Sequence, residues 1–128
     1  MRFLLDTHTL IWWMTSDPHL SKVGRGLITD RANTAVISAV SAWEIATKVR
    51  LGRLPSAAEL IEDFVGEMER QRIAILDVSA KHGIRAGSLP GPHKDPFDRM
   101  LIAQALCENI PIVSNDQALD GYGITRLW

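Results

Sequence analysis

The sequence lacks several features that would mark particular classes of protein. It has no apolar run near the ~20 residues that a membrane-spanning helix needs. The apolar stretch after Arg2 is broken at Asp6 and does not resemble a secretory signal, so we expect a cytoplasmic protein. The single cysteine, Cys107, excludes an intramolecular disulfide, and its apolar neighbours predict a buried structural thiol. With a net charge of −1, any contact with nucleic acid would need a local basic patch.

The residues that are present are typical of a globular domain. Hydrophobic residues make up 46% of the 128 positions and charged residues 23%. A chain of this length can bury roughly two thirds of its unfolded surface, so we expect one domain over residues 1–128. Short aliphatic and β-branched runs alternate with helical patterns. This alternation predicts an α/β fold with helices on both faces of a short, mostly parallel sheet of about four to five strands.

The pattern of apolar residues places the expected elements. Strands are expected at 3–5, 34–38, 73–78, 110–113 and 123–127. Helices are expected at 7–14, 20–28, 41–51, 57–71, 80–89 and from 96 onwards. Pro111 predicts that the fourth strand is short or near an edge of the sheet.

Acidic residues follow the expected strands. Asp6 and Asp116 come after the first and fourth strands, Glu44 lies shortly after the second, and Asp98 lies in the first turn of a helix. In parallel sheets these positions meet near the carboxyl ends of the strands, where ligands bind. Converging carboxylates repel one another and raise one another's pKa unless cations offset their charge. The sequence therefore predicts a site for Mg²⁺ or Mn²⁺, which prefer oxygen ligands.

Asp6 and Glu44 also have structural alternatives. Asp6 could accept hydrogen bonds from the first N–H groups of the helix that follows it. Ser41 and Glu44 match a capping box, in which the glutamate bonds back to the cap residue. Glu44 could also form an exposed i,i+4 pair with Lys48. These alternatives stay open at the level of sequence.

A second acidic pair lies at the start of the helix from Pro96. Asp95 can cap this helix, and Asp98 lies in its first turn, where the helix dipole favours a carboxylate. Stabilisation of the helix end explains Asp95 better than Asp98, because the rest of this helix is largely apolar.

The histidines and tryptophans give weaker signals. The histidines are scattered, so we predict no zinc site and expect surface or loop positions for His8, His19, His82 and His93. Adjacent Trp12 and Trp13 cannot both face the core, so at least one should be partly exposed and could contact a partner. Trp43 is expected in the core.

Four segments carry a family resemblance: LLDTH at 4–8, SAVSAWEIATKVRLGRL at 38–54, HKDPFDRMLIAQA at 93–105 and SNDQALDGYG at 114–123. Together, and in this order, they resemble the PIN-domain ribonucleases, specifically the VapC-like toxins of bacterial toxin-antitoxin pairs. The resemblance spans nearly the whole chain. It implies a three-layer α/β/α PIN-like domain in which four acids surround Mg²⁺ or Mn²⁺.

The resemblance assigns the catalytic and metal-binding acids to Asp6, Glu44, Asp98 and Asp116. Asp6 and Asp98 are the foremost candidates for direct metal ligands. Two further acids lie close to the quartet in sequence. Asp95 is a candidate for an assisting group, and Asp120 is an alternative to Asp116. The hydroxyl that orients the metal-binding acids in this family is either Thr7 or Ser114, and either could instead be a helix cap.

The implied activity is that of a metal-dependent endoribonuclease. Metal charge and a carboxylate would activate the water that attacks an RNA phosphodiester. Single-stranded or looped RNA is the expected substrate, because duplex RNA hides its bases in a narrow groove. Candidates for holding flanking phosphates, each of which could also be plain surface, are Lys48, Arg50, Arg53, Lys94 and Arg99.

The resemblance also implies protein partners. VapC-like toxins form homodimers, and an antitoxin segment packs into a hydrophobic groove on the toxin. We expect this groove on the helices at 41–51 and 57–71, with Leu51, Leu54, Phe64 and Met68.

Two other interpretations remain. A phosphatase would place a second Asp two residues after Asp6, but His8 stands there. A catalytically silent module that binds antitoxin or RNA would not need the intact acidic quartet.

Overall fold

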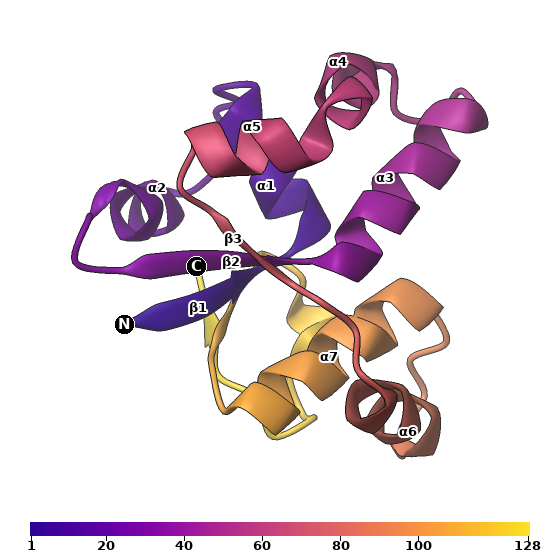
Figure 1. Cartoon of the computed structure of the whole chain (residues 1–128). Coiled ribbons are helices and arrows are strands. Elements are labelled where there is room, and N and C mark those ends of the chain that lie inside the picture. Colours follow the sequence, from indigo (N-terminus) through magenta and orange to yellow (C-terminus); the bar gives the residue numbers. More distant parts are fainter.

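A five-stranded sheet forms the middle layer of the structure, a computed structural model that describes residues 1–128 (Figure 1). Every pair of neighbouring strands is parallel, and the strand order is β3-β2-β1-β4-β5. The strands are β1 (Arg2–Leu5), β2 (Thr34–Ser38), β3 (Ala74–Leu76), β4 (Ile112–Val113) and β5 (Arg126–Leu127). The predicted parallel sheet is confirmed, and its last three strands are shorter than the apolar runs suggested.

Helices cover both faces of the sheet. One face carries α1 (Thr7–Met14), α2 (Lys22–Thr29), α3 (Ala39–Arg50), α4 (Ala58–Glu62) and α5 (Phe64–Arg70). The other face carries α6 (Ala80–Ser88) and α7 (Pro96–Glu108), which lie below the sheet in Figure 1. Two short 3₁₀ helices, η1 (Pro55–Ala57) and η2 (Gln117–Leu119), lie in connections. The predicted three-layer α/β/α class is therefore confirmed.

The central strand β1 supplies side chains to both apolar cores. Phe3 and Leu5 join the core under α1 and α3, whereas Leu4 joins the core under α7, and all three are fully buried. Successive side chains of a strand point to opposite faces, so a strand between two helical layers must be apolar on both. This explains the unbroken apolar run that precedes Asp6.

The register of β1 determines which residues meet at the carboxyl edge of the sheet. Leu5 lies beside Ile37 of β2 and beside Val113 of β4. β1 and β4 end at this level, and β2 ends one residue later. Residues from the segments after 5, 37 and 113, far apart in sequence, are thereby brought to one edge.

The helix expected over 57–71 is interrupted at Asp63. This residue has φ −143° and ψ 57°, which are not helical angles, and it separates α4 from α5. Its Oδ1 accepts a hydrogen bond from the Gly66 N–H, so Asp63 is the N-cap of α5. The amphipathic pattern continues through the break, which is why periodicity alone predicts one helix.

The two helices that carry candidate acids begin differently from one another. The start of α3 is capped by Ser38, whose Oγ accepts a hydrogen bond from the Val40 N–H. The structure therefore excludes the alternative in which Ser41 and Glu44 form a capping box, since both residues lie inside the helix. At α7 the prediction holds: Asp95 Oδ1 accepts hydrogen bonds from the backbone of the first turn.

None of the helices is long and apolar enough to cross a membrane. The last turn of α7 emerges from the core, so Leu106, Cys107 and Glu108 are half-buried. The prediction of a buried thiol at Cys107 is correct only in part.

Candidate active site

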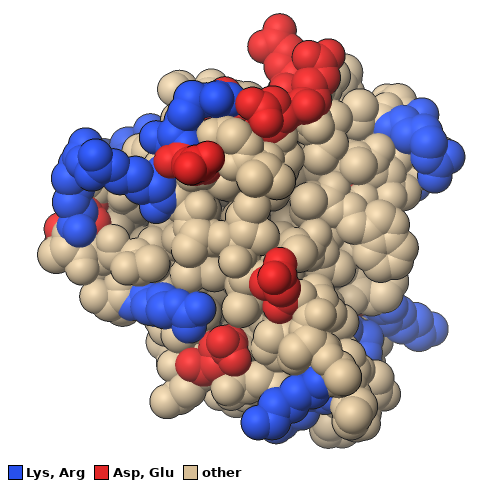
Figure 2. Space-filling view, in the orientation of Figure 1, with Lys and Arg blue, Asp and Glu red and all other residues tan.

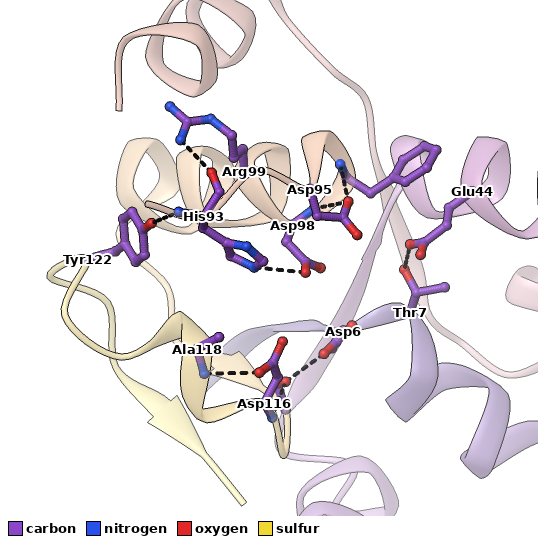
Figure 3. Close-up of polar contacts among 12 residues, drawn as sticks. Asp6, Thr7, Glu44, His93, Asp95, Asp98, Arg99, Asp116, Ala118 and Tyr122 are labelled. Atoms are coloured by element: carbon purple, nitrogen blue, oxygen red, sulfur yellow. Dashed lines mark hydrogen bonds and ion pairs between the residues drawn. The ribbon is translucent and has the colours of Figure 1, made fainter. Parts of the chain in front are cut away.

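A cavity of about 530 Å³ opens at the carboxyl edge of the sheet, and half of the ten residues that line it are acids. The four acids of the predicted quartet all line it, with Asp95 as a fifth. Figure 3 shows their carboxylates pointing into a common space from β1, α3, α7 and the segment after β4. The remaining lining residues are His8, Trp12, Lys48, Asn115 and Gln117.

Asp6 is buried at the end of β1, only 7% exposed. Its Oδ2 accepts a hydrogen bond of 2.5 Å from Ser114 Oγ, and its side chain makes no capping bond to α1. The helix-cap interpretation of Asp6 is therefore wrong. Burial raises the pKa of this carboxyl, and the bond from Ser114 acts in the opposite direction. Ser114 Oγ also accepts from the Asp116 N–H and so joins two of the acids.

Glu44 is held on both of its oxygens. Thr7 Oγ1 donates to Oε1 at 2.7 Å, and Lys48 Nζ lies 2.6 Å from Oε2. Because the one hydroxyl proton of Thr7 is used in that bond, Ser41 Oγ donates to Thr7 Oγ1 at 2.9 Å. The pair with Lys48 exists as the spacing allowed, but Glu44 is buried, which contradicts the expected exposed pair. Thr7 and Ser114, the two alternatives from the sequence, thus each orient a different acid.

Asp98 carries the most strongly perturbed carboxyl in the cavity. Its pKa is raised to about 6, first by burial and then by the negative charges of Asp95 and Asp6. His93 acts in the opposite direction. A carboxyl with this pKa is held in surroundings that disfavour its negative charge.

Asp116, and not Asp120, faces the cavity. Asp116 caps η2 through Oδ1, which accepts from the Ala118 N–H at 2.9 Å. Asp120 instead pairs with Arg126 through both of its oxygens, at 2.9 and 3.0 Å, and does not line the cavity. The geometry therefore favours Asp116 in the choice that the sequence left open.

His93 belongs to the same cluster, which the sequence reasoning missed. Its Nε2 lies 2.9 Å from Asp98 Oδ2, and ligand atoms of His93, Asp98 and Asp116 lie within 4.8 Å of one another (Figure 3). His93 does lie in a loop, as expected, whereas the expectation of a surface or loop position is wrong for His82, which is buried in α6. His93 lies in the irregular connection before α7, where no periodicity predicts the direction of a side chain. The one signal was its place in the segment HKDPFDR, which contains two candidate acids.

The donor set fits a divalent cation. Five carboxylates line the cavity. Against them the lining offers one lysine, Lys48, and one histidine, His8. In addition, His93 Nε2 is buried and has no hydrogen-bond partner. Buried polar atoms are rarely left without a partner. A cation between the carboxylates would give the nitrogen a partner and offset the repulsion between the negative charges.

The basic residues proposed for RNA phosphates divide into two groups. Lys48 lines the cavity. Arg99 does not, because its guanidinium donates to the backbone carbonyls of Ala86, Leu89 and His93 and holds the loop before α7. Its expected role as a phosphate ligand is therefore wrong. The others are exposed outside the cavity: Arg50, Arg53 and Lys94. In Figure 2, charged side chains of both signs are interspersed, with no continuous basic band on that face.

The tryptophans occupy different surroundings from those expected. Trp43 is 63% exposed and packs edge-on against Phe97, with 5.0 Å between ring centroids, so its expected core position is wrong. Trp12 and Trp13 are both half-buried, which confirms that they could not both face the core. Trp12 lines the acidic cavity and stacks on His19 at 5.4 Å.

The apolar groove expected on α3 to α5 is only partly available. Phe64 and Met68 are buried in the core and cannot line a groove. Leu51 is 49% exposed, and Leu54 packs against the core. A separate cavity of about 240 Å³ lies between α1 and the segment 56–67 and is lined by Ile11, Met14, Thr15, Ser56, Ala57, Glu59, Leu60 and Glu67.

Comparison with protein families shows which family the chain belongs to. The family model described as PIN domain matches residues 3–124. The chain belongs to the PIN domain family. Proteins of this family are generally nucleases. A search of curated proteins gave no significant match.

Solved structures share the PIN fold over almost the whole chain. VapBC2 from Rickettsia felis, bound to a DNA fragment from its promoter, matches with a TM-score of 0.71 and 19% identity, covering 99% of this chain and 98% of that one. VapBC-1 from nontypeable Haemophilus influenzae matches with a TM-score of 0.63 and 16% identity, covering 99% and 97%. At these identities the likeness shows the fold.

Proposed function

We propose that this PIN domain is a metal-dependent endoribonuclease and the toxin of a toxin-antitoxin pair. The observation that carries the proposal is the convergence of Asp6, Glu44, Asp98 and Asp116 in one cavity. Dedicated hydrogen bonds from Ser114 and Thr7 hold two of these acids in place. Such an arrangement is costly to a fold without a cation, and it is the arrangement that metal-assisted hydrolysis requires.

Each acid has a distinct role in the proposal. Asp6, Asp98 and Asp116 would hold Mg²⁺ or Mn²⁺, which supplies Lewis acidity to the phosphate and lowers the pKa of bound water. Glu44 is fixed by Thr7 and Lys48, and its oxygens retain further lone pairs, so it can accept a proton from a water in the cavity. The oxygen of that water then bonds to phosphorus as the bond to the 3′ oxygen breaks, and the departing oxygen takes a proton from solvent.

The lining of the cavity favours an unpaired strand as substrate. Trp12 provides an aromatic ring beside the acids, and Lys48 provides a cation. Unpaired bases stack on aromatic side chains, whereas bases within an A-form duplex are inaccessible to them. The choice of RNA rests on the resemblance to VapC-like toxins.

An antitoxin and a second copy of the chain are the proposed protein partners. Two structures with the same fold are of VapBC pairs, which supports an antitoxin for this protein as well. The cavity lined by Ile11, Met14 and Leu60 is the apolar surface that we propose for it, in place of the buried Phe64 and Met68.

Cleavage of a cellular RNA pool tests the proposed activity. The purified protein, free of antitoxin, is incubated with Mg²⁺ or Mn²⁺, beside an EDTA control, Asp98→Asn and the matched surface variant Glu62→Gln. We expect cleavage by the wild type and Glu62→Gln, and none by Asp98→Asn or with EDTA. Cleavage that persists in Asp98→Asn would contradict the assignment of this acid, and no cleavage by folded wild type would favour a silent binding module.

A further inference from the structure

We propose that His93 is a metal ligand, which makes the cavity a mixed nitrogen and oxygen site that favours transition-metal ions over Mg²⁺. The inference rests on the metal-dependent function proposed above and adds one residue and a metal preference to it. The carboxylates alone would form an oxygen site suited to Mg²⁺. An imidazole among them changes which ions bind best.

The position of the imidazole nitrogen is the first support. His93 Nε2, Asp98 and Asp116 present ligand atoms within 4.8 Å of one another, a spacing that one ion can span. Although Nε2 lies 2.9 Å from Asp98 Oδ2, it has no hydrogen-bond partner, so this contact lacks the alignment of a hydrogen bond. A buried nitrogen that neither donates nor accepts is available to a cation.

The backbone of His93 is fixed on both sides. Its N–H donates to Tyr122 Oη at 2.9 Å, and its carbonyl accepts from Arg99 Nη1 at 2.9 Å. Gly91 has φ +112°, and a Cβ at this position would lie 2.8 Å from Tyr122 Oη, so the loop requires glycine there to approach the tyrosine. The loop therefore holds the imidazole against the acids, as a preorganised ligand requires.

The chemistry of the donors gives the expected order of ions. Mg²⁺ binds oxygen ligands in a strict octahedral geometry and gains little from imidazole. First-row transition ions gain more from an imidazole nitrogen than Mg²⁺ does, and Co²⁺ binds nitrogen more strongly than Mn²⁺. Loss of the imidazole should therefore weaken Co²⁺ binding most, Mn²⁺ binding less and Mg²⁺ binding least.

A competing explanation makes the opposite prediction. If His93 were only a counter-charge for Asp98, its removal would leave the acids more exposed to one another and would tighten the binding of every divalent cation. Metal affinity alone therefore separates a ligand from a counter-charge.

Calorimetric titration of the metal-free full chain with Mg²⁺, Mn²⁺ and Co²⁺ is the test, with visible absorption of bound Co²⁺ as a second readout. His93→Gln is compared with His19→Gln, which removes an exposed imidazole that neither lines the cavity nor belongs to the cluster. We expect His93→Gln to weaken Co²⁺ binding by about tenfold or more and Mg²⁺ binding by less than about twofold, and to change the Co²⁺ spectrum. His19→Gln should leave affinities and spectrum unchanged.

Tyr122→Phe provides a second route if His93→Gln does not fold. It removes the oxygen that accepts from the His93 N–H but keeps the imidazole, so we expect a smaller loss in the same order of ions. Equal weakening of all three ions, or tighter binding in His93→Gln, would overturn the inference while leaving the proposed nuclease intact. Failure of wild type to bind any of the ions would instead contradict the proposed function.

Discussion

Replacing Asp98 by asparagine should stabilise the metal-free protein while abolishing its metal binding. Asp98 has a pKa of about 6 against an ordinary value of 3.8, because it is buried beside Asp95 and Asp6. The folded state therefore holds this proton more tightly than the unfolded chain does, and ionisation at neutral pH destabilises the fold. Asparagine is nearly isosteric and carries no charge, so the variant removes that penalty.

The size of the effect follows from the difference between the two pKa values. At ~1.4 kcal/mol for each pKa unit, the step from 3.8 to about 6 sets a ceiling of about 3 kcal/mol. The side chain remains 19% exposed, so solvent screening reduces the effect, and we expect about 1 to 2 kcal/mol. For a chain of 128 residues this corresponds to a rise in Tm of about 4 to 8 °C.

Thermal unfolding in EDTA provides the assay. The free energy of unfolding of wild type should increase as the pH falls from about 7 to about 5, because Asp98 takes up its proton in the folded state first. This slope should shrink in Asp98→Asn and persist in Glu62→Gln, which alters an exposed carboxylate outside the cavity. Saturating Mg²⁺, at about a hundred times its Kd, should stabilise wild type by about 2.7 kcal/mol and leave Asp98→Asn unchanged.

Two results would refute this reasoning. A lower Tm for Asp98→Asn than for wild type at neutral pH would mean that the carboxylate contributes to stability. A wild-type Tm that does not rise between about pH 7 and about pH 5 would mean that the charge is already compensated.

Three further substitutions test the supporting contacts. Ser114→Ala removes the hydroxyl that bonds Asp6 and should lower stability by about 1 to 3 kcal/mol and weaken metal binding, measured by denaturant unfolding and calorimetry. Arg99→Met leaves three backbone carbonyls without their donor and should increase proteolysis of the loop before α7, with a stability loss of about 2 kcal/mol or more. Trp12→Ala should weaken binding of a single-stranded oligonucleotide by about 1 to 3 kcal/mol in the Asp98→Asn background, measured by fluorescence anisotropy, and wild-type-like binding would exclude stacking on this ring.

The acids at strand ends were predictable because their positions follow from local patterns. A short apolar run followed by Asp6 specifies both a buried strand and the edge at which it ends. Parallel pairing of β1 with β4 then places Ser114 and Asp116 beside it. The rule that parallel strands share one carboxyl edge is general, so the sequence alone was sufficient to predict that these acids converge.

The features that the sequence did not reveal depend on contacts between distant segments. Ser41 and Glu44 have the spacing of a capping box, but the helix begins earlier because Ser38 caps it. Trp43 is large and apolar, yet α3 turns it toward solvent. His93 lies in a loop whose conformation depends on Tyr122, 29 residues away in sequence. Periodicity carries no information about such contacts.

The charges around the cavity show how the fold tolerates so many acids without a cation. Lys48 pairs with Glu44, and Ser114 donates to Asp6, so two of the four acids have a direct partner. Asp98 has only the misaligned contact with His93 and keeps a pKa of about 6. Burial still raises the pKa of Asp6, but Asp98 is the more strongly perturbed carboxyl and the group with most to gain from a divalent ion. The same residue should therefore dominate both metal affinity and the instability of the metal-free protein, which is why a single substitution at Asp98 separates the two.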